Sequence, residues 1–395
     1  MWRGRPGESR DAKKAATRMI RGRYFPIADH PADIERFWAA ARLLGTVNAP
    51  EWMGDDYRYL ADRSHDSLAP ADRAGYDAEL KEFEAAGGVV DEIDGGYRLF
   101  VQRPWWDEVW SIAMYAGPSP LALRPSPGIS MPAITRDDVT DVPAVFVADP
   151  FMLRAAETWH LFFEVMNWRS GRGEIALATS RDGVQWEYQR VVLAEPFHLS
   201  YPYVFRHDGD YYLVPESYEA GEVRLYRAVE FPLRWQPVAT LLKGEYLVDP
   251  SVFRHDGRWW MFVDASPGRG HDTLRLFGAA ELTGPWSEHP ASPLIEHDAA
   301  RARPAGRVTQ FDGRIIRFAQ NCGPAYGVQV RAFEVTDLTP RSYRERPVGP
   351  DPLLGASGSG WNASGMHHLD PHEIAPGRWI ACVDGWRSTL QETTE

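Results

Sequence analysis

The chain has 395 residues, of which 25% are charged and 44% are hydrophobic, as in an ordinary globular protein. Its formal net charge of −12 argues against nucleic acid as a partner, and its two cysteines exclude a disulfide scaffold. It contains no run of 18 apolar residues and no signal-peptide pattern. We therefore expect a soluble, cytoplasmic protein without a transmembrane segment.

The first hundred residues differ in character from the rest. Residues 1–23 carry eight Lys or Arg against two acids, which is typical of a solvated tail. Apolar spacing predicts helices over 31–44 and about 70–86, and short strands over 88–101. Residues 1–100 are therefore expected to form a basic tail and a small, mostly helical appendage.

Residues 101–395 consist of short predicted strands separated by turn signals, which is typical of an all-β domain. Two marker residues 15 positions apart recur five times, with a turn seven residues after the first marker. The pairs are Asp149 with Glu164, Tyr201 with Glu216, Asp249 with Asp264, Ala305 with Gln320, and Leu369 with Asp384. Three of the turns are Asp-Gly, a strong hairpin signal.

The first markers recur at intervals of 48 to 64 residues, which is typical of propeller blades built from four antiparallel strands. The fifth copy ends soon after Trp386, whereas residues 109–117 resemble the third strand of another copy. We predict that this earlier segment completes the fifth blade, because closing the ring removes an exposed sheet edge. The expected fold is an all-β, five-bladed β-propeller. An open sandwich is the alternative, but it does not require the fixed phase.

The repeat predicts a site at one mouth of the propeller channel, because a hairpin returns to the level at which it began. The acids expected there are Asp149, Glu164, Glu216, Asp249, Asp264 and Asp384. Crowded carboxylates raise one another's pKa, which is typical of functional sites, although structural hydrogen-bond networks have the same effect. A single Asp-Pro is more often a turn residue. Glu164 and Glu216 end apolar runs, where a carboxylate needs a partner or a task.

Other polar residues share this phase and are candidates for binding a ligand. They are His198, Tyr201, Arg303, His367 and His368, with Trp361 of the Gly-rich run 355–365 as a platform for stacking on a sugar. The run from His367 to His372 could hold a central divalent metal, but alternation along a strand sends neighbours to opposite faces. We therefore favour hydrogen-bonding histidines and expect no cofactor.

The plan of five blades opened by Asp-Pro resembles the propeller glycosidases of the arabinanase, β-xylosidase, levansucrase and invertase group, over about residues 140–390. This resemblance implies that Asp149 is the base or nucleophile and that Asp249 orients and tunes. The acid of the arabinanase-like branch opens the fourth blade, where this chain has Arg303. We assign Glu216 as the acid instead, with Glu164 in reserve.

A second resemblance rests on four segments: Val-Ala-Asp-Pro-Phe-Met (147–152), Phe-Phe-Glu (162–164), Phe-His-Leu-Ser-Tyr-Pro-Tyr-Val-Phe (197–205) and Val-Pro-Glu-Ser (214–217). They resemble the N-terminal domain of plant glucosamine inositolphosphorylceramide transferases and bacterial relatives, over roughly 109–386. In the plant proteins a separate glycosyltransferase domain follows. The resemblance thus implies carbohydrate chemistry without assigning that chemistry to the propeller.

These observations favour a carbohydrate-active enzyme that acts through paired carboxylates on a carbohydrate or glycoconjugate. A glycoside hydrolase is the leading hypothesis. One alternative is a non-catalytic sugar-binding propeller that serves a glycosyltransferase. Another is a propeller redirected to group transfer or cyclisation in small-molecule biosynthesis.

Overall fold

A computed structural model describes residues 57–64, 81, 89–93, 96–102, 108–126, 131–323 and 325–388. The chain divides into two units, of which the first contains residues 1–107. Its described residues form an antiparallel sheet of order β1-β3-β2, made of β1 (Tyr57–Ser64), β2 (Val89–Ile93) and β3 (Gly96–Gln102). The strands β2 and β3 correspond to those expected over 88–101. The helices expected over 31–44 and 70–86 lie outside the described residues, apart from the helical Lys81.

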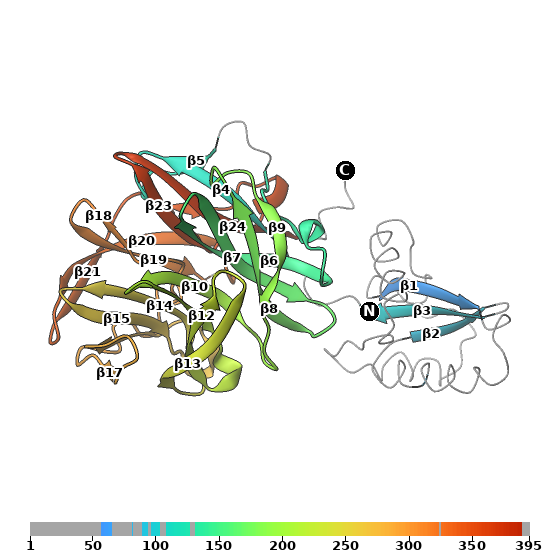
Figure 1. The fold of residues 1–395 in the computed structure, drawn as a ribbon, viewed down its shortest axis with the longest axis horizontal. Helices are drawn as coiled ribbons and strands as arrows, with labels where there is room; N and C mark the ends of the chain where they lie inside the picture. The colour runs from blue at the N-terminus through green and yellow to red at the C-terminus, as the bar shows by residue number, and fades with distance from the viewer. Residues whose placement is uncertain are drawn as a thin grey trace. The chain divides into compact units, whose positions relative to one another are not determined.

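The described residues of the second unit form five antiparallel sheets, which are the blades of a propeller (Figure 1). Blade I contains β6 (Ala144–Ala155), β7 (Thr158–Asn167), β8 (Arg172–Ser180) and β9 (Glu187–Leu193). Blade II contains β10 (Ser200–His207), β11 (Asp210–Glu216), β12 (Glu222–Glu230) and β13 (Arg234–Lys243). Blade III contains β14 (Val248–His255), β15 (Arg258–Asp264), β16 (Leu274–Ala279) and β17 (Ser287–Glu288). The predicted five-bladed propeller is confirmed.

Blade IV contains β18 (Thr309–Phe311), β19 (Arg314–Asn321), β20 (Gln329–Leu338) and β21 (Tyr343–Pro347), with β22 (Leu354–Gly355) also paired to β20. Blade V contains β23 (Leu369–Ala375), β24 (Arg378–Ser388), β4 (Glu108–Gly117) and β5 (Arg124–Pro125). Short 3₁₀ turns occur at η2 (Arg136–Asp138), η3 (Tyr218–Ala220), η4 (Pro267–Arg269) and η5 (Gly360–Asn362). Among the described residues, no helix has the length and apolar character needed to cross a bilayer.

The hairpins between the inner strands owe their tightness to backbone in the left-handed region. In the turn of blade II, Asp208 and Gly209 have φ of 49° and 92°, and the Asp-Gly turns of blades III and IV repeat this pattern. Positive φ at both central residues defines the type I′ turn, whose twist matches that of paired strands. The regular turn fixes the register of each hairpin, and therefore the level at which its two markers meet.

The hydrophobic core of the described propeller lies between neighbouring blades rather than at its centre. Phe151 and Phe162 of blade I pack with Tyr203 and Leu213 of blade II in one such cluster. Similar clusters join blades II and III, III and IV, and IV and V. Each large apolar side chain buried there contributes about 1.5–3 kcal/mol. Because the apolar side chains pack between neighbouring blades, the channel mouth is not needed for the core and can hold polar groups.

The ring is completed by strands from both ends of the propeller segment. Residues 109–117 lie in β4, which pairs antiparallel with β24 from Glu108–Ser388 to Gly117–Trp379. The strands β4 and β24 lie side by side in Figure 1, although they differ widely in chain position. A further cluster then packs Ile112 of blade V against Val147 of blade I. Blade V therefore closes the ring, and the blade V residues at the channel mouth depend on that closure for their position.

Candidate active site

The first markers of blades I to III share an unusual backbone geometry. Asp149, Tyr201 and Asp249 have φ of 52°, 45° and 53°. At each of them the register with the second strand shifts, so each lies in a β-bulge. A non-glycine residue in the left-handed region costs roughly 1–2 kcal/mol. The same cost at three equivalent positions makes these bulges candidates for directing groups to a site.

The second markers lie level with the bulges and are all buried. Strand pairing aligns Glu164 with Ala148, Glu216 with Ser200, and Asp264 with Val248. Gln320 of β19 and Asp384 of β24 hold the corresponding places in blades IV and V. None of the five is more than 5% exposed. The hairpin repeat thus delivers five polar side chains to one level, as the sequence predicted.

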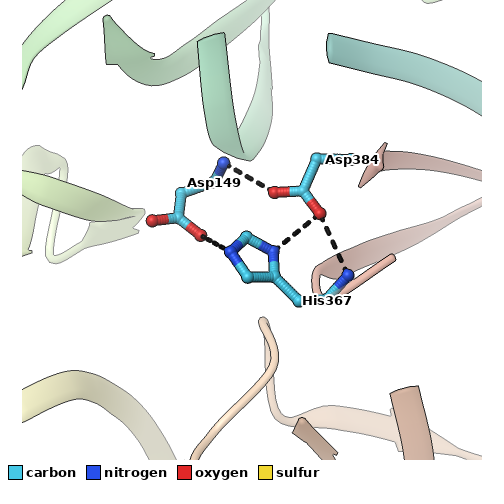
Figure 2. Close-up of side chains that lie close together, drawn as sticks. All are labelled: Asp149, His367 and Asp384. Atoms are coloured by element: carbon cyan, nitrogen blue, oxygen red, sulfur yellow. Dashed lines mark hydrogen bonds and ion pairs between the residues drawn. The ribbon is translucent and has the colours of Figure 1, made fainter. Parts of the chain in front are cut away.

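Asp149, His367 and Asp384 form a hydrogen-bonded group across the junction of blades V and I (Figure 2). One oxygen of Asp384 accepts the backbone N–H of Asp149 at 2.9 Å. The other lies 2.8 Å from Nδ1 of His367 and also accepts the backbone N–H of that residue at 3.3 Å. With Nδ1 directed to Asp384, Nε2 of His367 faces Asp149 Oδ1 at 3.8 Å. Asp384 therefore positions both the backbone of Asp149 and the imidazole beside it.

The charges within this group are unequal. Burial is the largest single influence on Asp384 and would raise its pKa, but the charge and hydrogen bond of His367, together with the N–H of Asp149 and other partners, hold the pKa below its usual range. Burial would lower the pKa of His367, yet the Asp384 carboxylate raises it. Asp149 has less compensation, so burial raises its pKa to about 7. The two shifts thus favour an ionised Asp384 beside a protonated His367, and Asp149 can gain or lose a proton near neutral pH.

Asp249 is held by two donors from blade IV. Arg303 donates through Nε to Oδ2 at 2.6 Å and through Nη2 to Oδ1 at 3.3 Å. Gln320 adds a third bond, from Nε2 to Oδ2 at 2.9 Å. Arg303, the polar residue expected at the start of blade IV, therefore lies at the mouth and forms a buried ion pair with Asp249. Its remaining Nη1 donates to Nδ1 of His271 at 2.9 Å.

Glu164 and Glu216 are buried with few partners. Ser200 donates to Oε2 of Glu216 at 3.2 Å, and Nε2 of His198 lies 3.4 Å from Oε1 of Glu164. Oε1 of each glutamate has no hydrogen bond. Burial, followed by the charge of Asp249, raises the pKa of Glu216 to about 8. Burial and the neighbouring carboxylates also hold the pKa of Glu164 well above its usual range. Glu216 therefore holds its proton in most molecules at neutral pH, and the pKa of Glu164 is shifted in the same direction.

Tyr201 and His368 are placed inside the wall of the site. The Tyr201 hydroxyl lies 2.8 Å from Ser251 Oγ and donates to the Gly306 carbonyl at 3.0 Å, while its backbone N–H donates to Asp149 Oδ2 at 3.2 Å. His368 is fully buried, with its ring edge-on to Phe151 and Tyr201. Burial lowers the pKa of His368 to about 4, so it is neutral. Tyr201 and His368 therefore lie beside Asp149 within the protein wall and fix its position.

Asp370 and His372, the other polar residues of the His367–His372 run, have partners outside the Asp149 group. Asp370 accepts from Arg307 and from the backbone N–H of Met152, and lies 3.0 Å from Nε2 of His372. Trp361, on η5, is half-buried and packs against the cluster between blades IV and V. Trp361 thus has a packing role in the fold, whatever it offers to a ligand.

Sequence reasoning missed two aromatic residues that border the acids. Trp110 of β4 stacks on His367 with ring centroids 4.0 Å apart. Tyr326 lies edge-on to the same imidazole at 5.4 Å and carries the Arg303 guanidinium 5.1 Å above its ring. Neither belongs to the 15-residue phase, because Trp110 arrives through ring closure and Tyr326 through the loop between β19 and β20. The repeat contained no signal for either.

A divalent metal fits this site poorly. Among the described residues, the trio that brings ligand atoms within 4.8 Å of one another is Asp149, His367 and Asp384. Both oxygens of Asp384 already accept N–H groups, and Nδ1 of His367 is directed to Asp384. Hard divalent cations such as Ca²⁺ take about six to eight oxygen ligands. The trio is better explained by proton sharing.

Comparisons with known proteins agree on one family. The family model described as glucosamine inositolphosphorylceramide transferase 1, N-terminal, matches residues 106–386. The protein named glucosamine inositolphosphorylceramide transferase 1 from Oryza sativa subsp. japonica is 36% identical over 305 residues, or 72% of this chain. Its namesake from Arabidopsis thaliana is 34% identical over 302 residues, or 71% of this chain. The chain spans only 41% and 39% of the length of these two relatives.

The solved structures that resemble this one do so in backbone alone. An exo-beta-1,3-galactanase from Clostridium thermocellum gives a TM-score of 0.45 at 14% identity. The likeness covers 57% of this chain and 52% of that one.

Proposed function

This chain belongs to the family described as glucosamine inositolphosphorylceramide transferase 1, N-terminal, and from that membership we propose that its propeller is a carbohydrate-active enzyme. The leading form of the proposal is cleavage of a glycosidic bond by paired carboxylates. The transferase name belongs to relatives of which this chain spans only 41% and 39%, so transfer by the propeller itself is a variant of the same proposal.

The observation that carries the proposal is the division of protons between Glu216 and Asp149. With a pKa of about 8, Glu216 holds a proton at neutral pH and can give it to the leaving oxygen. With a pKa of about 7, Asp149 is ionised in a large share of molecules and can activate water or attack the sugar. Two carboxyl groups with different tasks are the requirement for this chemistry.

Asp249 has the tuning role in this proposal. Its charge is the largest contribution after burial to the raised pKa of Glu216. Arg303 and Gln320 fix its position through three hydrogen bonds, so that contribution is constant while substrate binds and leaves. Glu164, whose pKa is also raised, is the second proton donor available at the same mouth.

The test is turnover of a glycan library by the Asp149→Asn and Glu216→Gln variants. We expect each to lose about 10²–10⁴-fold in rate, the usual contribution of a positioned acid or base. The Asp208→Asn variant is the matched control, because that side chain is 84% exposed at a hairpin turn. Near wild-type turnover in both site variants, with folding intact, would reject the assignment.

The pH profile gives an independent check. Activity requires an ionised Asp149 and a protonated Glu216, so the rate should be greatest between about pH 7 and pH 8. The Glu216→Gln variant should lose the alkaline limb of this profile in its residual activity. A maximum near pH 5 would contradict the assigned protonation states.

The second candidate is a sugar-binding propeller that serves a glycosyltransferase. The observation that favours it is the Arg303–Asp249 pair, since a guanidinium stands where the arabinanase-like resemblance places an acid. Calorimetry separates the two candidates. A binding module retains affinity for its glycan in acid-to-amide variants and turns over no substrate, whereas the enzyme cleaves the glycan that it binds.

A further inference from the structure

One ring nitrogen of His271 lies between a cationic donor and a buried acceptor. Its Nδ1 is 2.9 Å from Nη1 of Arg303 and 3.6 Å from Oδ2 of Asp264. A guanidinium has no lone pair with which to accept, so Nδ1 must accept from Arg303. Oδ2 of Asp264 is buried and has no hydrogen bond. The same atom therefore faces a donor that it satisfies and an acceptor that it does not.

The proton state of His271 decides which of these two neighbours it can bind. A neutral imidazole carries one N–H, which is on Nε2 when Nδ1 accepts. The hydroxyl of Tyr246, 3.3 Å away, is a second donor to the same lone pair of Nδ1. A proton added at Nδ1 ends both interactions and places a second positive charge beside the guanidinium. The new N–H then has Asp264 Oδ2 as its acceptor.

His271 faces titratable groups from four other parts of the propeller. Among the described residues they are Asp264 of β15, Arg303 before β18, Tyr246 before β14, and Tyr326 between β19 and β20, with Arg269 and Asp272 in its own loop. Burial raises the pKa of both tyrosines, so their hydroxyls stay neutral where histidines titrate. The His271 side chain is 26% exposed, so its proton exchanges with solvent.

The loop between β15 and β16 is anchored to the same acid that faces His271. Oδ1 of Asp264 accepts the backbone N–H of Ser266 at 3.0 Å and also its hydroxyl group. Oγ of Ser266 accepts the backbone N–H groups of Asp272 and Thr273 at 2.6 and 2.9 Å. His271 has φ of 56°, a left-handed conformation that costs roughly 1–2 kcal/mol. The loop thus directs this imidazole at a definite cost.

The position of Arg303 affects several groups of the mouth at once. Burial raises the pKa of Glu216 and of Asp149, and the charge of Arg303 opposes that rise in both. Such an effect depends on the distance between the charges. Asp249 binds Nε and Nη2 of the guanidinium, and His271 binds Nη1. A change at His271 therefore reaches the acids through Arg303.

We propose that His271 is a positioning residue whose proton selects between two arrangements of the mouth. In the neutral form, Nδ1 binds Nη1 of Arg303. In the charged form, Nδ1 donates to Oδ2 of Asp264 and releases the guanidinium on that side. Histidines change charge between about pH 5 and pH 8, so mild acidification drives the exchange. The exchange is the same whether the propeller cleaves a glycan or only binds one.

Nitrogen-15 NMR of the histidine rings in the full chain measures the exchange. At pH 8 we expect His271 to carry its proton on Nε2 alone, and at pH 5 on both nitrogens. Asp264→Asn removes the acidic partner but keeps an oxygen for Ser266. The ratio of charged to neutral His271 at pH 6 should therefore fall at least about tenfold in this variant. His297 is the internal control, because it also has a left-handed φ, of 57°, is 90% exposed and should not respond.

The His271→Asn variant tests the other partner. Asparagine tolerates a left-handed φ, and its amide oxygen accepts from Arg303 at every pH. In the wild type, the Nε–H signal of Arg303 should shift between pH 8 and pH 5 in step with the His271 ring. The variant should lose that component and keep any shift caused by Asp149 and Glu216, which titrate near pH 7 and pH 8. His297→Asn should behave as the wild type.

Each outcome decides the inference. An unprotonated Nδ1 at pH 5, an unchanged ratio in Asp264→Asn, or an Arg303 signal that shifts equally in wild type and His271→Asn would overturn it. The two variants alter opposite sides of the imidazole, so a folding defect in one leaves the other informative. Because the spectra need no substrate, a lack of turnover rejects the proposed function alone. Turnover that depends on Asp149, with a His271 ring that does not exchange partners, rejects only the inference.

Discussion

Blades I to III and blades IV and V use the same strand position in opposite ways. In the first three, Glu164, Glu216 and Asp264 each leave a buried oxygen without a hydrogen bond. In the last two, Gln320 donates to Asp249 and to the Pro304 carbonyl, and Asp384 is satisfied by Asp149 and His367. We call blades IV and V the closed side of the mouth, because the protein supplies hydrogen-bond partners at this position. Blades I to III are the open side, because one oxygen of each acid has no hydrogen bond. The same repeat position therefore provides residues that stabilise the site in blades IV and V and incompletely bonded acids in blades I to III.

The largest expected effect comes from breaking the closed side at Arg303. The Arg303→Leu variant leaves Asp249, which is 1% exposed, without its cation. We expect the free energy of unfolding to fall by about 3–5 kcal/mol, as for other buried pairs that lose one partner. Urea denaturation measures this loss. Arg331→Leu, which breaks the exposed pair with Asp351, should cost no more than about 1 kcal/mol. Equal losses in the two variants would contradict the buried role of Arg303.

A second test weakens the closed side at Asp384. The Asp384→Asn variant removes the charge that holds His367 and should lose about 2–3 kcal/mol at pH 7. The folded pKa of Asp384 lies below its unfolded value of about 3.9, so its contribution is present above that pH and is lost as the pH falls through the folded pKa. The difference from wild type should therefore persist down to about pH 4 and shrink as the pH falls further. A difference that grows on acidification would contradict the assigned ion pair.

The open side should respond with the opposite sign. The folded pKa of Glu216, about 8, lies above the unfolded value of about 4.3, so its contribution to stability is complete below pH 4 and is lost as the pH rises through the folded pKa. Glu216→Gln removes this loss. We expect the variant to exceed wild type by about 1–3 kcal/mol at pH 8 and to match it near pH 4, although its activity falls. Urea denaturation at both pH values gives the comparison, and a destabilised variant at pH 8 would reject it.

The smallest effect is expected at Tyr201, which links the two sides. Its hydroxyl lies between Ser251 of blade III and Gly306, which precedes blade IV. Tyr201→Phe should cost about 1 kcal/mol in thermal or urea unfolding, the usual net value of a hydrogen bond. Tyr188→Phe removes a hydroxyl bonded to the exposed Asp141 and should cost less. The link would be unimportant if the two variants were equally stable.

The blade plan could be predicted because it is encoded locally. Strand length, the Asp-Gly turns and the position of the bulge all lie within one hairpin, so the 15-residue phase carries them. The same phase brought Glu164, Glu216 and Asp264 to one level. Local pattern therefore accounts for the architecture and for the composition of the mouth.

The partnerships within the mouth depend on how the ring closes, and the sequence did not specify them. Arg303 was expected at the mouth, but its pairing with Asp249 spans 54 residues and two blades. Trp110 meets His367 only because β4 joins blade V. Tyr326 comes from a loop that has no periodic signal. The expected helices of the appendage lie outside the described residues, so that prediction stands as made.

The arrangement around Asp149 depends on the assembly of blade V from the two ends of the propeller segment. The backbone N–H of Asp149 is bonded to a residue 235 positions away, on a strand whose neighbour β4 precedes Asp149 in the chain. Until these distant strands meet, Asp149 has neither its anchor nor its imidazole. An incomplete or partly unzipped ring would keep most of its sheets and still be inert. If the proposed acid–base chemistry is measured during denaturation, its loss should therefore precede loss of β structure, so activity would report whether the ring is closed.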